Sequence, residues 1–133
     1  MEKKQTVVFV CEHGAAKSVL AAAYFNRFAA QMGLDMQAVA RGTKPDQELS
    51  PQTVKGLAAD GLTPTEEVPQ KLTVTDTESA QRVVAFCDLP AEFHRRAMIE
   101  RWEDIPAVSE DYEKSRDVII DRIRQMLNAP ELH

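Results

Sequence analysis

The chain has 133 residues, of which 44% are hydrophobic and 28% are charged, and its formal net charge is −5. This length suits one domain with a buried core, and no linker or internal repeat is visible, so we expect residues 1–133 to form a single domain. Acidic and basic residues are intermixed without a basic stripe, which argues against a nucleic-acid-binding protein. No segment is long and apolar enough for a membrane span or a signal-peptide core, so we expect a cytoplasmic protein.

A short apolar strand and a helix are predicted first. Residues 5–10 (QTVVFV) are apolar and β-branched, the pattern of a strand that is buried on both faces. Apolar residues then recur at every fourth position, which predicts a helix whose buried stripe consists of Leu20, Tyr24, Phe28 and Met32. Gly33 is a suitable C-terminal stop for this helix, and residues 36–40 are expected to form a second strand.

Helix-start signals mark the middle of the chain. Ser50 followed by Pro51 predicts an N-cap and a first helical position, and Gly61 predicts the end of that helix. The buried side of this helix is expected to consist of Val54, Leu57 and Ala58. Thr75 and Glu78 have the spacing of a capping box, which predicts a further short helix.

Two more strands and a last helix are predicted in the second half. Residues 82–87 (RVVAFC) are expected to form a third strand, and residues 97–102 a fourth. A helix is expected to begin near Ser109, with Glu110 and Asp111 favourably placed in its first turn. Its buried stripe is expected to consist of Ile119, Ile123, Met126 and Leu127.

The order of these elements predicts the fold class and the place of the two cysteines. Strands that alternate with helices indicate an α/β fold with a parallel sheet and right-handed crossovers. Ligands of such folds bind at the carboxyl ends of the strands. Cys11 and Cys87 each end a predicted strand, so we expect both thiols in one neighbourhood. A permanent disulfide between them is not expected in a reducing compartment.

The segment between the first strand and the first helix has the composition of an anion-binding loop: Cys11, Glu12, His13, Gly14, Ala15, Ala16, Lys17 and Ser18. Small residues let the backbone curl and point N–H groups inward, and the following helix adds the positive end of its dipole. The thiolate form of Cys11 is favoured there, and Ser18 is placed to donate a hydrogen bond to the sulfur. A nucleotide P-loop is excluded, because Cys11 and Ala16 stand where that motif needs glycine.

Cysteine, five residues, then a basic residue and serine resembles the low-molecular-weight protein tyrosine phosphatases and the thioredoxin-coupled arsenate reductases related to them. The resemblance extends over nearly the whole chain. Residues 7–10 resemble the first strand of the family, residues 40–43 its second-strand ending, and residues 102–106 the loop that carries its acid. The resemblance implies a flavodoxin-like fold, with a four-stranded parallel sheet and helices on both faces.

The resemblance also implies roles for the loop residues. Cys11 would be the nucleophile on phosphorus or arsenic, and Ser18 would stabilise its thiolate. Lys17 takes the place of the arginine with which the family grips phosphate. Lysine lacks the planar fork of arginine, and one lost transition-state donor typically costs about 10²–10³ in rate, so weak phosphatase activity is expected. Glu12 disfavours a dianion unless it points outward, and His13 is able to compensate as a donor or a cation.

The sequence indicates the general acid less clearly than the nucleophile. Asp104 is expected to protonate the leaving oxygen and later to activate water. The family has aspartate directly before proline, whereas Ile105 intervenes here, so Glu103 and Asp88 stay open as alternatives. Trp102 is expected to be a packing anchor of this loop.

Cys87 resembles the second cysteine of the arsenate reductases, which pass the oxidation from the loop cysteine to a second and then a third. The third cysteine is absent, because the chain holds only two. A relay of the usual thioredoxin-coupled form is therefore incomplete. A disulfide between Cys11 and Cys87, or a small thiol as partner, would still allow the protein to reduce an oxyanion.

Three functions stay open. The favoured one is a phosphomonoesterase that acts through a Cys11 phosphoenzyme on a phosphorylated small molecule or a phosphotyrosine protein. The second is an arsenate reductase that uses Cys11, Cys87 and a thiol donor, and the third is a non-catalytic, oxyanion-binding regulator. No cofactor is expected. No metal is expected either, because His13, His94 and His133 have no ligand spacing with the cysteines.

Overall fold

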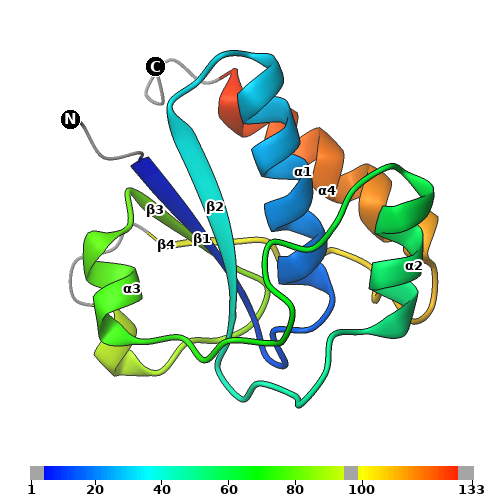
Figure 1. The fold of residues 1–133 in the computed structure, drawn as a ribbon. Helices are drawn as coiled ribbons and strands as arrows, with labels where there is room; N and C mark the ends of the chain where they lie inside the picture. Colours follow the sequence, from blue (N-terminus) through cyan, green and yellow to red (C-terminus); the bar gives the residue numbers. More distant parts are fainter. Residues whose placement is uncertain (1–4, 95–98, 129–133) are drawn as a thin grey trace.

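Four parallel strands form the sheet that positions the rest of the molecule (Figure 1). The computed structural model describes residues 5–94 and 99–128. The strands are β1 (Gln5–Cys11), β2 (Met36–Gly42), β3 (Arg82–Ala85) and β4 (Ile99–Arg101), in the order β2-β1-β3-β4. The predicted α/β fold with an all-parallel sheet is thus confirmed.

The central strand is β1, which pairs in parallel with β2 on one side and with β3 on the other. Its apolar run from Val7 to Val10 is almost completely buried, as the sequence pattern predicts for a strand covered on both faces. β3 ends two residues before the predicted limit, at Ala85, although the Phe86 amide still donates to the carbonyl of Val10 (2.8 Å). Of the predicted fourth strand, residues 97 and 98 lie outside the described residues.

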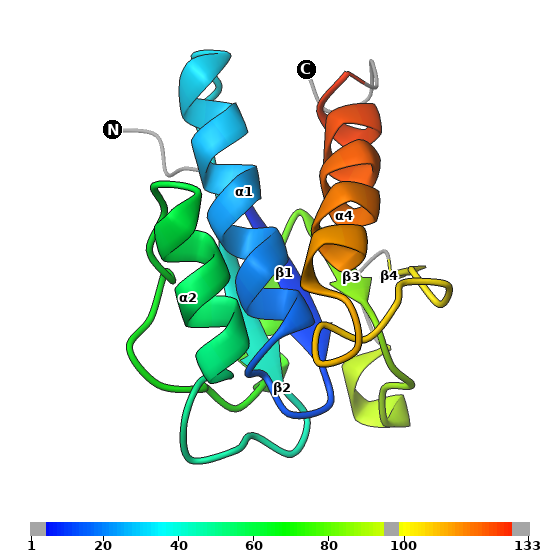
Figure 2. The same cartoon turned by 90° about the vertical axis from the view of Figure 1, so that its right-hand side faces the viewer.

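Helices cover both faces of the sheet. α1 (Lys17–Gln31), α2 (Pro51–Ala59) and α4 (Tyr112–Leu127) pack on one face, in front of the strands in Figure 2. α3 (Val74–Ser79) and the short 3₁₀ helix η1 (Ala91–Phe93) lie on the other. Alternate residues of β1 serve these two sides, because successive side chains of a strand point to opposite faces. Val7 and Phe9 belong to the larger core, and Val8 and Val10 to the smaller one.

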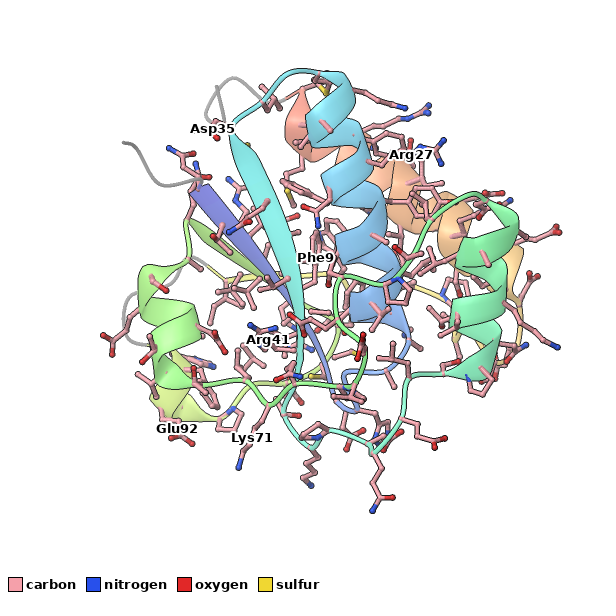
Figure 3. All side chains as sticks on the ribbon, viewed as in Figure 1. Phe9, Arg27, Asp35, Arg41, Lys71 and Glu92 are labelled. Atoms are coloured by element: carbon pink, nitrogen blue, oxygen red, sulfur yellow. The ribbon has the colours of Figure 1, made fainter. Side chains whose placement is uncertain are left out.

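Aromatic rings fill the larger core where the sheet meets α1. Phe9 lies between the sheet and α1 (Figure 3). Its ring centroid is 6.0 Å from that of Phe25 on α1 and 5.8 Å from that of Trp102, which follows β4. Phe86 packs edge-on against Trp102 at 5.7 Å. The end of β3, the end of β4 and the first helix are thereby held together beneath the loop that contains Cys11.

Asp60, at the end of α2, joins three helices. Its carboxylate accepts hydrogen bonds from the hydroxyls of Tyr24 on α1 (2.5 Å) and Tyr112 on α4 (3.2 Å). Arg116 of α4 pairs with the same carboxylate at 3.5 Å. Burial, with the negative charge of Asp60, raises the pKa of both tyrosines, so their hydroxyls remain donors.

Several local predictions are corrected. Met32, expected in the buried stripe of α1, is 44% exposed, because the helix ends at Gln31 and Met32 is its C-cap. Val54 (38% exposed) and Ala58 are not on the buried side of α2, which consists of Thr53 and Leu57. This orientation lets Gly56 face the ring of Tyr112, where an added Cβ would lie 2.1 Å from ring carbon.

Two helix starts also differ from their predicted places. The capping box lies at Thr73 and Asp76, two residues before the predicted pair, and Asp76 also pairs with Arg41 of β2 at 3.2 Å (Figure 3). α4 begins at Tyr112 with Asp111 as N-cap, three residues after the predicted start. The predicted N-cap Ser50 is confirmed, since its hydroxyl accepts from the Thr53 amide. The predicted buried stripe of α4 is confirmed throughout: Ile119, Ile123, Met126 and Leu127.

In the described part of the chain, no helix has both the length and the apolar character needed to cross a membrane.

Candidate active site

The loop between β1 and α1 is curled tightly against the end of β2. Gly14 adopts a left-handed conformation with φ 61°. A Cβ on Gly14 would lie 2.9 Å from the amide nitrogen of Gly42, and a Cβ on Gly42 would lie 2.7 Å from that of Gly14. The two glycines are therefore in contact through their backbones, which holds the loop at the carboxyl edge of the sheet.

The hydrogen bonds of the loop leave its N–H groups available. The carbonyls of Glu12, His13 and Ala15 accept from the segment at 44–50, with distances of 2.8, 3.0 and 2.9 Å. Among the described residues, no backbone carbonyl accepts from the N–H groups of residues 12–17. Ala16, the N-cap of α1, supplies no side-chain cap, and the first turn holds no acidic residue. A curled run of unpaired N–H groups at a helix N-terminus is suited to an oxyanion.

Cys11 and Ser18 lie at the floor of this loop. The sulfur of Cys11, at the end of β1, is 3.0 Å from the hydroxyl oxygen of Ser18 in the first turn of α1, and either atom can be the donor. Ser18 is fully buried and Cys11 is 8% exposed. A hydroxyl held at this distance can donate to a thiolate, which is the contact expected from the sequence.

A cavity of about 640 Å³ opens over the thiol. Its walls are the loop itself, residues 46–51, Phe86 with Cys87, and residues 107–109. This volume lies in the range of small-molecule sites. The wall at 46–51 was not foreseen, since Ser50 and Pro51 predict a helix start but no part in a site. The hydrogen bonds that bring this segment to the loop come only with the folded chain.

Lys17 lines this cavity at the start of α1. No carboxylate of residues 5–94 and 99–128 lies within ion-pair distance of its ammonium group. His13, by contrast, is exposed between two carboxylates, with Nδ1 3.2 Å from Asp46 and Nε2 3.7 Å from Glu12. Lys17 is thus the basic side chain that remains to meet an anion in the cavity.

The acid candidates do not reach the cavity. Asp104 is 70% exposed and accepts two hydrogen bonds from Arg122 of α4, at 2.6 and 2.8 Å. Asp88 and Glu103 both pair with Arg101, at 2.6 and 2.9 Å. None of the three lines the cavity over Cys11.

Packing explains why this loop turns its carboxylates away. Trp102, Ile105 and Val108 are buried at intervals of three residues, so the side of the loop between them faces outward. Residues 107–109 therefore form the cavity wall on this side, and they carry no carboxyl group. The apolar spacing from Trp102 to Val108 was the sequence signal for this orientation.

Cys87 lines the same cavity as Cys11, as expected for two cysteines at neighbouring strand ends. Both are free thiols, and Cys87 is half-buried. Burial raises the pKa of the Cys87 thiol, the charge of nearby Cys11 raises it further, and a hydrogen bond with Thr43 works in the opposite direction. This contact with Thr43, a residue distant in the chain, has no signal in the sequence around Cys87. The described residues contain no cluster of three His, Cys, Asp or Glu side chains able to hold a metal ion.

The contact between Gly14 and Gly42 allows a matched test of the loop. Gly14→Ala is expected to lower the unfolding free energy by about 1–2 kcal/mol for the left-handed backbone and by about 1–3 kcal/mol more for the clash. Gly33→Ala has a similar φ of 69° with no atom within 4 Å of the added Cβ, so it carries only the first cost. Urea denaturation of both variants measures the difference. Equal losses would show that the approach of the two backbones is not tight.

A family model described as low molecular weight phosphotyrosine protein phosphatase matches residues 6–129. A comparison with curated proteins finds no match.

Solved structures with the same fold include phosphatases and arsenate reductases. A low molecular weight protein tyrosine phosphatase from T. tengcongensis has a TM-score of 0.83 at 20% identity, over 92% of this chain and 97% of that chain. YfkJ from Bacillus subtilis has a TM-score of 0.80 at 21% identity, over 95% and 94% of the two chains. A thioredoxin-dependent arsenate reductase from Corynebacterium glutamicum has a TM-score of 0.75 at 21% identity, over 95% of this chain and 61% of that chain. At such low identities the likeness concerns the fold alone.

Proposed function

Since the chain belongs to the low molecular weight phosphotyrosine protein phosphatase family, we propose that it is a thiol-dependent enzyme of this family that reduces arsenate through Cys11 and Cys87. The observation that carries the proposal is that both thiols line one cavity, beneath a loop with unpaired N–H groups. Structural relatives include a thioredoxin-dependent arsenate reductase, which is in keeping with this chemistry.

The first step is attack of the Cys11 thiolate on arsenic. An S–As bond forms, and one arsenate oxygen leaves as water after taking a proton from solvent. The loop N–H groups, the start of α1 and Lys17 hold the remaining oxygens. Ser18 keeps the thiolate oriented by its 3.0 Å contact.

The second step uses Cys87. Its thiolate attacks the sulfur of Cys11, so that an S–S bond forms and the S–As bond breaks. The electron pair of the broken bond stays on arsenic, which is reduced from As(V) to As(III) and leaves as arsenite. The Cys11–Cys87 disulfide then needs two equivalents of an external thiol to return to the reduced enzyme.

The arsenate reaction is favoured over ester hydrolysis because of what faces Cys11. An alkoxide or phenoxide leaving group needs a general acid, and none of Asp88, Glu103 and Asp104 lines this cavity. Of the carboxylates that do line it, those of Glu12 and Asp46 lie beside His13. Reduction of arsenate releases water in its first step, and in its second the electron pair of the S–As bond stays on arsenic, which leaves as arsenite. It therefore has less need of a protein acid.

Replacing Cys87 tests the proposal. With arsenate and millimolar dithiothreitol, Cys87→Ala is expected to form arsenite at least about 100-fold more slowly than wild type, because an external thiol cannot match one held beside the adduct. Since the pKa of Cys87 is raised, the wild-type rate should keep rising with pH after an ordinary thiol has finished titrating. Thermal stabilisation by arsenate is the control that binding is retained. A Cys87→Ala variant as active as wild type would contradict the proposal.

A second candidate is phosphomonoester hydrolysis on a phosphorylated small molecule or a phosphotyrosine protein. It is favoured by Asp46 and Glu48, carboxylates that line the cavity and are able to act as the acid. The same two proteins assayed on an aryl phosphate separate the candidates, because hydrolysis would survive in Cys87→Ala whereas arsenate reduction would not. Phosphate binding without turnover of either substrate would instead indicate a regulatory, oxyanion-binding protein.

A further inference from the structure

Cys87 lies between two cavities. One is the cavity over Cys11, and the other, of about 480 Å³, is bordered by Cys87 together with Glu12, Lys44, Asp88 and Arg101. The second cavity does not include Cys11. A ligand in it would therefore lie against Cys87 and not against Cys11.

The second cavity carries charges of both signs. Lys44 and Arg101 supply two cations, and Glu12 and Asp88 supply two carboxylates. Arg101 and Asp88 are bonded to each other at 2.6 Å, and the pKa of Arg101 is raised by this contact, so the guanidinium stays charged. Lys44 is exposed and forms no ion pair with the described carboxylates. Such a wall is matched by a ligand that carries both carboxylate and ammonium groups.

We propose that the second cavity is the binding subsite of a small zwitterionic thiol, which reduces the Cys11–Cys87 disulfide by attacking the sulfur of Cys87. This inference rests on the proposed function, because that reaction produces the disulfide. The size of the cavity suits a small molecule, and its place beside Cys87 suits an attacking sulfur.

The two sulfurs of the disulfide are not equivalent toward a thiol. Cys11 is 8% exposed at the floor of its loop, whereas Cys87 is half-buried and borders the second cavity. The better-stabilised thiolate leaves faster in thiol–disulfide exchange. Cys11 has the hydroxyl of Ser18 at 3.0 Å and the start of α1 beside it, so it is the better leaving group.

The exchange balances with two thiols. The thiolate of the first forms an S–S bond with Cys87, and the Cys11–Cys87 bond breaks with its electron pair on Cys11. A second thiol then attacks the mixed disulfide, which releases the small-molecule disulfide and the Cys87 thiolate. The two electrons that reduced arsenic are thus supplied by the two thiols.

The inference is tested on the purified protein after oxidation with diamide to the Cys11–Cys87 disulfide. Second-order rate constants for reduction are measured with glutathione, which has two carboxylates and an ammonium group, and with neutral 2-mercaptoethanol, each corrected for its thiolate concentration. We expect glutathione to react about two- to fivefold faster with wild type, the effect of one exposed ion pair. Lys44→Gln should remove this advantage, and mass spectrometry of a trapped intermediate should find glutathione on Cys87.

The matched control is Lys55→Gln, which changes an exposed lysine of α2 that lines neither cavity and should leave both rates unchanged. Glutathione no faster than 2-mercaptoethanol, equal behaviour of the two lysine variants, or glutathione attached to Cys11 would each overturn the subsite. So would a disulfide that only a protein reductase can open. If diamide or arsenate turnover produces no Cys11–Cys87 disulfide, the proposed function fails and the subsite fails with it.

Discussion

Cys11→Ser is expected to lower turnover of arsenate, or of an aryl phosphate, by at least about 10⁴-fold, because both proposed reactions begin with the Cys11 nucleophile. Serine is similar in size, so the buried position at the end of β1 is kept. Initial rates of arsenite formation and of phosphate release measure the effect. A residual rate within tenfold of wild type would exclude Cys11 as the nucleophile.

Two controls show what Cys11→Ser removes. Phosphate should still raise the melting temperature of Cys11→Ser, because the unpaired N–H groups of the loop and Lys17 are unchanged. Ser18→Ala keeps the nucleophile and loses only the hydroxyl 3.0 Å from its sulfur, so its rate should fall by no more than about 10²–10³-fold. A Ser18→Ala variant as inactive as Cys11→Ser would show that Ser18 has a larger part than positioning the thiolate.

Trp102→Ala is expected to lower the unfolding free energy by about 3–5 kcal/mol, which is a large part of the total stability of an ordinary domain. Trp102 is 1% exposed and packs against Phe9 and Phe86, with ring centroids 5.8 and 5.7 Å away. Its indole N–H donates to Glu100 at 2.5 Å. Urea denaturation, read by circular dichroism because the chain has a single tryptophan, measures the loss.

Two control variants show how much of the loss in unfolding free energy comes from the packing of Trp102. Trp102→Phe should lose less than Trp102→Ala, because it keeps an aromatic ring between Phe9 and Phe86. Val54→Ala, on the exposed side of α2, should change the unfolding free energy by only about 0.5 kcal/mol or less. A loss below about 1 kcal/mol in Trp102→Ala would contradict the role of Trp102 as the anchor beneath the loop.

The residues around Lys17 indicate what the lysine in place of the family's arginine does in the loop. Lys17 is the cavity-lining cation that no described carboxylate neutralises, whereas His13 lies between Glu12 and Asp46. A point charge on a flexible stem grips an oxyanion less specifically than a planar fork. This favours a reaction in which a second thiol, rather than precise stabilisation of a phosphoryl group, does much of the work.

Elements that depend on neighbouring residues were predicted well. The N-cap at Ser50 was predicted from Ser50 and Pro51 alone, because a cap needs only a side chain and an amide three residues away. The buried strand at β1 was predicted because its apolar run leaves no polar face. The loop from Cys11 was placed correctly because it is bounded by these two kinds of signal, a strand end and a helix start.

Elements that depend on distant partners were predicted poorly. The apolar residues Val54 and Ala58 suggested the buried side of α2, but the helix is turned by the fit of Gly56 to the ring of Tyr112. The role of Asp104 as an acid stays a prediction, but its carboxylate accepts hydrogen bonds from Arg122 on α4 and does not line the cavity over Cys11. Neither partner is visible in the local sequence.

The sequence by itself determined the α/β fold and the place of the loop from Cys11 to Ser18 between a strand end and a helix start, because both follow from periodicity and from residues close together in the chain. Only the tertiary structure decided which side chains surround that loop. It placed residues 107–109, and not Asp104, in the wall of the cavity that Cys11 lines, and it placed Cys87 between two cavities. These arrangements are set by core packing between residues far apart in sequence, which no local pattern encodes.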